Sequence, residues 1–214
     1  VTDTCLFRDG TSSAEVWDAV TGEIRQLRNV TRRGLEAVIP IVLEAYQSLF
    51  FVFDKRENLS PRIPDDIREK KLLLTLEGPW SVAFDPAWGG PGRVVFDRLT
   101  DWTQRPEEGI RHYSGIATYS TTFDLPECGA SEFYLDLGTV NHLAQVKLNG
   151  QNLGVVWTAP WEVRVTSALR KHGNHLEIEV ANLWVNRLIG DESHPWDGPE
   201  HGAWPAWLLQ GTAR

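Results

Sequence analysis

Apolar and polar residues alternate most clearly at 144–148, AQVKL, where every second side chain is apolar. This period of two is typical of a strand with one buried face. Asn149 and Gly150 follow directly, and this pair tolerates the positive φ angles that a two-residue type I′ turn needs. A second apolar stretch at 151–157 completes the pattern, so the segment predicts a tight β-hairpin.

Short runs rich in Val, Ile, Phe and Tyr surround this hairpin and predict further strands. They lie at 80–84, 92–99, 115–125, 131–138, 161–165 and 175–184. In the last run, Leu176, Ile178 and Val180 are expected to face inward, and the two intervening glutamates to face solvent. Seven or eight short strands at roughly ten-residue spacing predict an all-β sandwich rather than a parallel α/β sheet.

The pattern contains one helical hint, at 166–174. Thr166 is placed to cap a single turn there, and Gly173 is placed to end it. The loop after the hairpin is interrupted by Pro160 and carries Trp157 and Trp161, so it is expected to present two indole rings near one end of the sheet.

A smaller β unit precedes the sandwich. The segment 15–27 predicts two strands joined by a turn at Thr21 and Gly22, and 35–53 supplies two more apolar runs. A polar stretch with two prolines follows and resembles a linker. The predicted division is a small β domain at 1–54, a linker at 55–71 and a sandwich domain at 72–214.

Composition narrows the partners. The formal net charge of -8 argues against nucleic acid, because neutralising phosphates requires clustered Lys and Arg. No apolar run is long enough to span a membrane, and the amino terminus does not resemble a signal peptide. The chain starts at Val1 and contains no Met, so we expect a fragment or a processed product. Cys5 and Cys128 are expected to be two inert, buried thiols.

Motifs for catalysis are missing from the sequence. The glycine-rich stretch at 87–93 lacks the Lys and Ser or Thr of a phosphate-binding loop and is predicted to be a turn. His172 and His175 flank a Gly-Asn turn and are expected to lie in a solvated loop rather than at a metal. No pair of carboxylates with the spacing of a glycosidase can be nominated from the strand pattern. We therefore expect no catalytic residue, no metal site and no cofactor in this chain.

Ten tryptophans are the most unusual feature of the composition. Trp17 and Trp80 lie within predicted strands and are assigned to the core. The other candidates lie at strand ends or among prolines and glycines: Trp102, Trp157, Trp161, Trp184, Trp196, Trp204 and Trp207. Such rings can stack on the apolar faces of sugars, or they can fill layer edges and contacts between domains.

Several segments together resemble a known family. They are HYSGIATYSTTFDLP at 112–126, the LNGQNLG hairpin, VTSALRKHGNHLEI at 165–178 and the run NLWVNRLIGD at 182–191. This chain is similar to the galactose-binding-like jelly roll that serves as the sugar-binding domain of glycoside hydrolase family 2. The resemblance is greatest to the C-terminal region of family 106 α-L-rhamnosidases, and the segments near 14–27 and 43–55 resemble the small β domain that precedes the jelly roll there.

The resemblance implies a function and a partner. Catalytic carboxylates of such enzymes lie on a (β/α)₈ barrel, and this sequence lacks the repeated strand-helix pattern of a barrel. The chain is therefore expected to be an ancillary carbohydrate-recognition module beside a catalytic barrel, in a parent enzyme that is secreted or periplasmic. The alternative is a purely structural sandwich that buttresses the barrel. The family pattern continues with a further strand, so the jelly roll is expected to be truncated at its C-terminus.

The resemblance also implies where sugar would bind. The loop before the YSGIATY-like strand and the segment after the VANLW-like strand approach the active-site mouth in family 2 enzymes. The residues expected at the sugar are Trp102, His112, Trp157, Trp161, Trp184, Asn186, Arg187 and Asp191. Arg187 donates, Asp191 accepts and Asn186 does both toward hydroxyl groups. Arg187 and Asp191 can alternatively pair with each other and fix an irregular loop.

Overall fold

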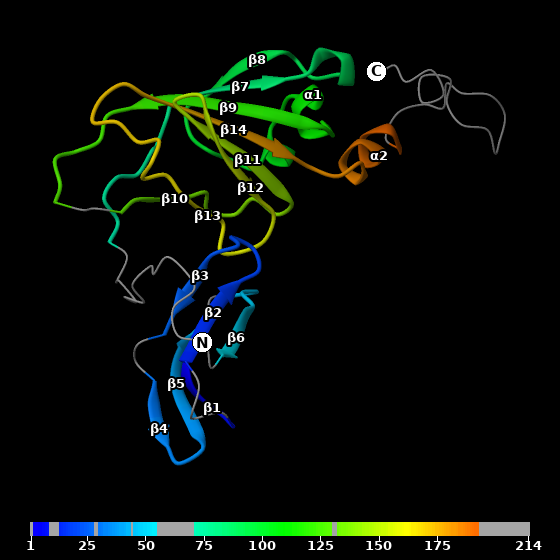
Figure 1. Cartoon of the computed structure of the whole chain (residues 1–214). Helices are drawn as coiled ribbons and strands as arrows, with labels where there is room; N and C mark the ends of the chain where they lie inside the picture. Colours follow the sequence, from blue (N-terminus) through cyan, green and yellow to red (C-terminus); the bar gives the residue numbers. More distant parts are fainter. Residues whose placement is uncertain are drawn as a thin grey trace. The chain divides into compact units, whose positions relative to one another are not determined.

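The structure is a computed structural model, and it describes residues 2–8, 13–27, 30–43, 45–54, 71–129 and 132–192 (Figure 1). The chain divides into two compact units, Val1–Lys71 and Leu72–Arg214. Each unit is considered by itself. Except for Lys71, the predicted linker lies outside the described residues, and so do Trp196, Trp204 and Trp207.

The first unit contains two three-stranded antiparallel sheets. One has the order β1-β5-β4, with β1 at Thr2–Phe7, β5 at Glu36–Val42 and β4 at Thr31–Arg33. The other has the order β3-β2-β6, with β3 at Ile24–Gln26, β2 at Ser13–Asp18 and β6 at Leu49–Asp54. The strands predicted within 15–27 and 35–53 are confirmed, although the two apolar runs of 35–53 belong to different sheets.

A small apolar core forms between these elements. Ala14, Ala37 and Ile39 are buried, and the Phe7 ring lies 4.9 Å from the ring of Phe51 and 5.2 Å from that of Phe53. Ala14, Phe51 and Phe53 lie on one face of β2 and β6, and the other three of these residues come from β1 and β5. The assignment of Trp17 to the core is wrong, because Trp17 lies on the opposite face and is 41% exposed.

The second unit is built on a six-stranded antiparallel sheet with a separate two-stranded sheet, β10-β13 (Figure 1). The order of the large sheet is β12-β11-β14-β9-β7-β8. Its strands are β7 at Trp80–Phe84, β8 at Arg93–Phe96, β9 at Ile116–Phe123, β11 at Leu143–Leu148, β12 at Gln151–Val156 and β14 at Asn174–Ala181. The short pair is β10 at Tyr134–Asp136 and β13 at Glu162–Arg164. Every predicted strand of this unit is confirmed, most with narrower bounds.

The predicted alternation of faces is also confirmed. Ala144, Val146 and Leu148 of β11 are buried, with exposed fractions of 0–1%. They join an aromatic core that includes Trp80, Phe84, Phe96 and Tyr113. The turn between β11 and β12 has φ of 54° at Asn149 and 81° at Gly150, as the type I′ prediction requires.

Four short helical elements complete the described part of this unit. They are the 3₁₀ turns η1 at Pro86–Trp88 and η2 at Trp102–Gln104, and the helices α1 at Glu108–Arg111 and α2 at Val185–Glu192. The helical hint at 166–174 is realised only as a turn at 166–168. Thr166 does not cap that turn through its hydroxyl, because the hydroxyl exchanges hydrogen bonds with the backbone of Phe133 at 2.9 and 3.3 Å.

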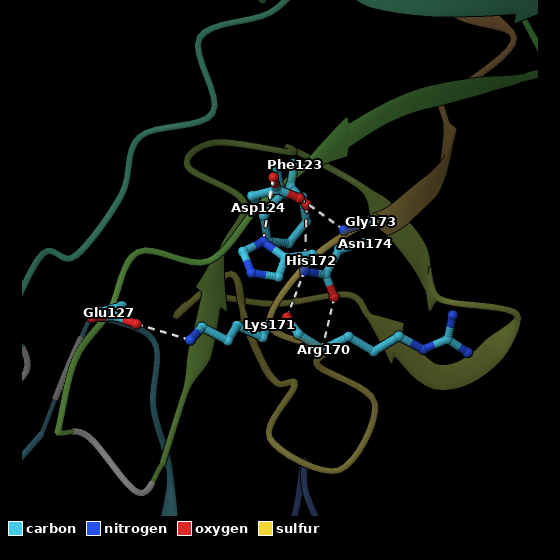
Figure 2. Close-up of polar contacts among 8 residues, drawn as sticks. All are labelled: Phe123, Asp124, Glu127, Arg170, Lys171, His172, Gly173 and Asn174. Carbon is cyan, nitrogen blue, oxygen red and sulfur yellow. Dashed lines mark hydrogen bonds and ion pairs between the residues drawn. The ribbon is translucent and has the colours of Figure 1, made fainter.

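A polar network closes the end of the sandwich where β9 stops and β14 starts (Figure 2). Asn174 is fully buried, and its side chain bonds to Arg170 N, Arg170 O and Phe123 O at 2.8, 2.7 and 3.3 Å. Asp124 accepts from the backbone N–H of Gly173 at 2.7 Å, and Lys171 pairs with Glu127 at 2.8 Å. The loop at 170–174 is thus held by side chains rather than by helix hydrogen bonds.

Both cysteines are free thiols. Cys5 is half-buried and Cys128 is exposed, so the expectation of two buried thiols is wrong for Cys128. None of the helices within the described ranges has the length and apolar character needed to cross a bilayer.

Candidate functional site

Two segments that are far apart in the sequence meet at one end of the sandwich, beside α1 and α2 (Figure 1). Asn182 accepts from the backbone N–H of Gly115 at 2.9 Å and donates to the carbonyl of Tyr113 at 2.8 Å. The hydroxyl of Ser114 donates to the carbonyl of Leu183 at 2.9 Å. These bonds join the segment before β9 to the segment after β14, which are the two segments that the resemblance implied.

The polar residues of α2 point into this junction. Asn186 donates to the carbonyls of Arg111 and Tyr113 at 2.7 and 2.9 Å, and the backbone N–H of Arg187 donates to Ser114 Oγ at 2.8 Å. The three bonds fasten the first turn of α2 to the segment 111–114. The side chain of Asn186 is therefore engaged within the protein rather than directed at a ligand.

Arg187 and Asp191 form an ion pair one helical turn apart, with Arg187 Nε 3.2 Å from Asp191 Oδ1. Both side chains are mostly buried, with exposed fractions of 12% and 21%. The alternative pairing considered from the sequence is thus present. It lies in a helix, α2, rather than in an irregular loop.

His112 packs directly against α2, at Gly190. A Cβ atom built on Gly190 would come within 2.6 Å of His112 Cβ and 2.7 Å of His112 Cγ, so only glycine permits this approach. His112 Nε2 accepts from Arg111 Nε at 3.0 Å. Its Nδ1 is buried and has no hydrogen-bond partner in the described part of the chain. This histidine packs between two segments and does not present its ring to solvent as a ligand would require.

Trp102 lies in the core. Its exposed fraction is 6%, and its ring packs edge-on against Phe84 and Tyr113 at centroid distances of 5.7 and 6.1 Å. The ring face of Trp102 that was expected to stack on sugar is therefore covered, and Trp102 is not part of the proposed site. The reason is that η2 starts at Trp102 and turns its side chain toward the sheet.

Trp184 remains accessible and has an unexpected neighbour. It is 49% exposed, and its ring lies edge-to-face against Trp88, which is 40% exposed, at a centroid distance of 5.5 Å. Trp88 ends η1, where Asp85 accepts from Ala87 N at 2.9 Å as an N-cap. Trp88 was not expected at this site, because the glycine-rich pattern at 87–93 predicts only a turn. The capping pair Asp85-Pro86 was the available signal for an ordered 3₁₀ turn there.

Trp157 and Trp161 belong to the connection between β12 and β13. Trp157 is 59% exposed, whereas Trp161 is half-buried and accepts a backbone hydrogen bond from Leu137 N at 2.8 Å. That bond extends the β10-β13 ladder. Trp157 therefore offers an exposed ring, and Trp161 contributes to the local sheet.

Charged groups near α1 are mutually paired. Arg105 donates to both carboxylate oxygens of Glu107 at 3.1 and 2.7 Å, and these bonds lower the pKa of the Glu107 carboxyl.

Burial raises the pKa of Tyr113, whose hydroxyl donates to the carbonyl of Ile116 at 3.0 Å and stays protonated. In the described ranges, no group of three or more His, Cys, Asp or Glu side chains is placed to hold a metal ion.

The outward face of α2 is apolar. Val185, Leu188 and Ile189, together with Leu183 just before the helix, are each more than half exposed. The helix is thus inverted relative to an ordinary surface helix, because its polar side chains face the protein and its apolar side chains face outward. Val185, Leu188 and Ile189 stand at the i, i+3, i+4 spacing of an amphipathic helix, so the sequence did contain a signal for α2, but that spacing does not tell that the apolar face points outward.

Comparison with known proteins identifies the class of the second unit. Residues 107–206 match the family model described as glycosyl hydrolase 2 galactose-binding domain-like. The matched range includes both segments of the junction and the strands between them. Over the matched residues the second unit is similar to galactose-binding-like domains of this kind, and the predicted fold class, a galactose-binding-like β-sandwich, is confirmed.

Two relatives show where such sequences occur. The structure of a rhamnosidase from Novosphingobium sp. PP1Y matches 90% of this chain with a TM-score of 0.79 and 34% identity. A protein of Formosa agariphila, provisionally named a beta-glucuronidase, is 40% identical over 166 residues, or 74% of this chain. The chain spans 18% of the first protein and 14% of the second. Most of each relative thus lies outside the region that corresponds to this chain.

Proposed function

We propose that the chain is a non-catalytic carbohydrate-recognition part of a glycoside hydrolase with a rhamnosidase-like architecture, and that a catalytic barrel outside this chain cleaves the bond. The observation that carries the proposal is the exposed Trp88–Trp184 pair at the junction of the galactose-binding-like domain. The match of this domain to a sugar-binding class and the small share of each relative that the chain covers both support it.

The geometry suits recognition by stacking. Two indole rings at nearly right angles, with an interplanar angle of 81°, offer one ring face and one ring edge to a pyranose. The apolar face of the sugar packs on a ring, and an indole N–H donates to a hydroxyl. The hydrogen bonds of Asn182, Asn186 and Ser114 hold the backbone that carries Trp184, so little freedom is lost on binding. The role of Asn186 in this proposal is to position Trp184.

A second candidate function rests on a different observation. The exposed apolar residues of α2 favour contact with another protein surface, because such patches commonly mark interaction sites. In this interpretation the sandwich buttresses the catalytic barrel through α2. The two functions use adjacent surfaces, the indole pair and the outward face of α2, and substitutions can separate them.

A printed array of oligosaccharides, including glycans that end in α-L-rhamnose and β-D-glucuronic acid, tests the proposed function. The 214-residue chain is expected to bind a subset of the glycans, and Trp184→Ala and Trp88→Ala are expected to abolish binding to at least part of it. Leu188→Ala, which alters only the apolar face of α2, serves as the matched control and is expected to bind as the wild type does. If the folded chain binds none of the glycans, the result would favour the second candidate function, in which the sandwich supports the catalytic barrel through α2.

A further inference from the structure

A second aromatic surface lies in the first unit, on the face of the β3-β2-β6 sheet that is turned away from the apolar core. Trp17 of β2 is the direct register partner of Phe50 of β6, and the two side chains are 41% and 60% exposed. Ile24 of β3 is the register partner of Trp17 on its other side. Three strands therefore contribute one apolar row across the sheet. We call this row and its neighbours the outer β2 face.

The adjacent row of the outer β2 face carries two polar residues, Glu15 and Gln26, and one apolar residue, Val52. Glu15 lies two residues before Trp17 on the same face, and its register partners are Gln26 of β3 and Val52 of β6. The indole N–H of Trp17 donates to Glu15 Oε2 at 2.9 Å. This bond fixes the orientation of the ring and leaves Glu15 Oε1 and the amide of Gln26 beside the aromatic row.

We propose that the outer β2 face binds a neutral oligosaccharide, with Trp17 and Phe50 as stacking rings and Glu15 as the acceptor for sugar hydroxyls. Trp17 and Phe50 are exposed at directly opposed positions of neighbouring strands, so both rings are available on one sheet face to pack against the apolar faces of linked pyranoses. A carboxylate and an amide next to the rings match the hydroxyl groups at the sugar edge. The site is separate from the Trp88–Trp184 pair, and the proposal goes beyond the function proposed for the second unit.

The chemistry of the face favours a sugar over a protein partner. The buried centres of protein interfaces are depleted in charged residues, yet Glu15 stands in the middle strand of this surface. Covering its carboxylate with a protein surface would carry a desolvation cost that a matching donor must offset, whereas sugar hydroxyls donate directly to it. The negative charge of Glu15 also repels the carboxylates of uronic acids, so the proposed ligand is a neutral glycan.

The test uses the whole 214-residue chain on an oligosaccharide array with neutral and uronic-acid-containing members. We expect binding of neutral glycans, and we expect Trp17→Ala and Phe50→Ala each to weaken that binding by about tenfold or more. Trp17→Phe retains a ring and should keep part of the affinity. Tyr134→Ala changes an aromatic side chain of similar exposure in the other unit, 46% against 41% for Trp17, and serves as the control, with binding expected to be unchanged. Each variant is first checked for an unchanged Tm, and Trp17→Phe replaces Trp17→Ala if the latter unfolds.

Three results would overturn the proposal. The first is no binding of any neutral glycan by the folded wild-type chain. The second is binding that Trp17→Ala and Phe50→Ala leave intact but Trp184→Ala removes, which would support the function proposed for the second unit and reject this site. The third is concentration-dependent self-association in sedimentation that the Trp17 and Phe50 variants abolish, because the face would then be an interface between copies of the chain.

Discussion

Individual backbone positions determine the hairpin that the sequence shows most clearly. Gly150 has φ of 81°, and a Cβ built there meets no atom within 4 Å. The constraint on this position is therefore conformational and not steric crowding by neighbours. Gly150→Val is expected to lower the free energy of unfolding by about 1 kcal/mol or more, because a β-branched residue resists positive φ.

Gly129→Val is the matched control for this prediction, since Gly129 also has open space around its Cβ position but is not among the glycines with positive φ. Thermal or urea unfolding of both variants measures the difference. Equal midpoints for the two variants would show that the turn does not impose the φ angle seen at Gly150.

Asn186 gives a second prediction at this scale. Its side-chain N–H groups satisfy the carbonyls of Arg111 and Tyr113, which lie in a partly buried junction. Asn186→Ala leaves both carbonyls without this partner and is expected to cost about 1–3 kcal/mol of stability. Asn152→Ala is a suitable control, because Asn152 makes an exposed local bond to Gly154 N.

The readout for Asn186 is the Tm together with turnover and KM in a full-length parent enzyme. A loss of stability is expected from the bonds seen here, and any rise in KM should accompany that loss, because Asn186 is proposed to act on sugar binding only by positioning Trp184. A higher KM at an unchanged Tm would instead show that Asn186 contacts sugar directly. Arg187→Ala and Asp191→Ala can be compared in the same way, because the structure pairs these two side chains with each other.

At the scale of elements, α2 depends on a close approach to the segment before β9. Gly190 lies against His112, and a Cβ at 190 would come within 2.6 Å of His112 Cβ and within 2.7 and 3.1 Å of the ring atoms Cγ and Nδ1. Gly190→Ala would favour an isolated helix, yet the overlap is expected to dominate and to destabilise the unit by about 1–3 kcal/mol. Leu188→Ala on the exposed face of the same helix is expected to change the Tm little. An increased Tm for Gly190→Ala would mean that α2 does not pack on His112 as described.

The loop between β13 and β14 gives a pH-dependent prediction (Figure 2). The backbone N–H of Gly173 donates to Asp124, and together with His172 it holds the pKa of that carboxyl below its ordinary value of 3.8. A carboxyl whose pKa is lower in the folded state stabilises the protein above its unfolded pKa, and this contribution is lost as the pH falls through the folded pKa. Asp124→Asn should therefore show a shallower loss of Tm than the wild type as the pH falls below about 4.

Glu127→Gln is the control for the pH experiment. Glu127 pairs with Lys171 in a highly exposed position, where ion pairs contribute little, so its acid dependence should match that of the wild type. If Asp124→Asn and the wild type lose Tm with the same slope, the bond from Gly173 does not stabilise the charged carboxylate.

Some elements of the second unit could be predicted from the sequence and others could not. The hairpin and the strands of the large sheet were predictable, because their apolar side chains face a core and alternate with period two. By contrast, the i, i+3, i+4 spacing of Val185, Leu188 and Ile189 is a helical signal for α2 that does not show its apolar face pointing outward, and Trp88 was missed because a three-residue 3₁₀ turn has no periodicity. The residues chosen for the sugar site came from a resemblance that located the right segments. It could not reveal that Trp102 turns inward or that Asn186 bonds to backbone.

For the whole molecule, the absence of a nominable carboxylate pair predicts how the chain behaves alone. The isolated chain is expected not to hydrolyse aryl α-L-rhamnosides, aryl β-D-galactosides or aryl β-D-glucuronides above background. A purified sample that hydrolyses one of them, with activity that disappears on a single Asp or Glu substitution, would contradict this prediction. A preparation of a full-length rhamnosidase serves as the positive control.

The second unit is proposed to recognise carbohydrate through the Trp88–Trp184 pair. The most direct test is an NMR titration of the ¹⁵N-labelled chain with the glycan that binds best on the array, following the indole N–H signals that Trp88→Ala and Trp184→Ala assign. Both signals are expected to shift together and saturate, while the signal of the buried Trp102 stays in place. Saturable binding of that glycan with no shift of either the Trp88 or the Trp184 signal would contradict the claim.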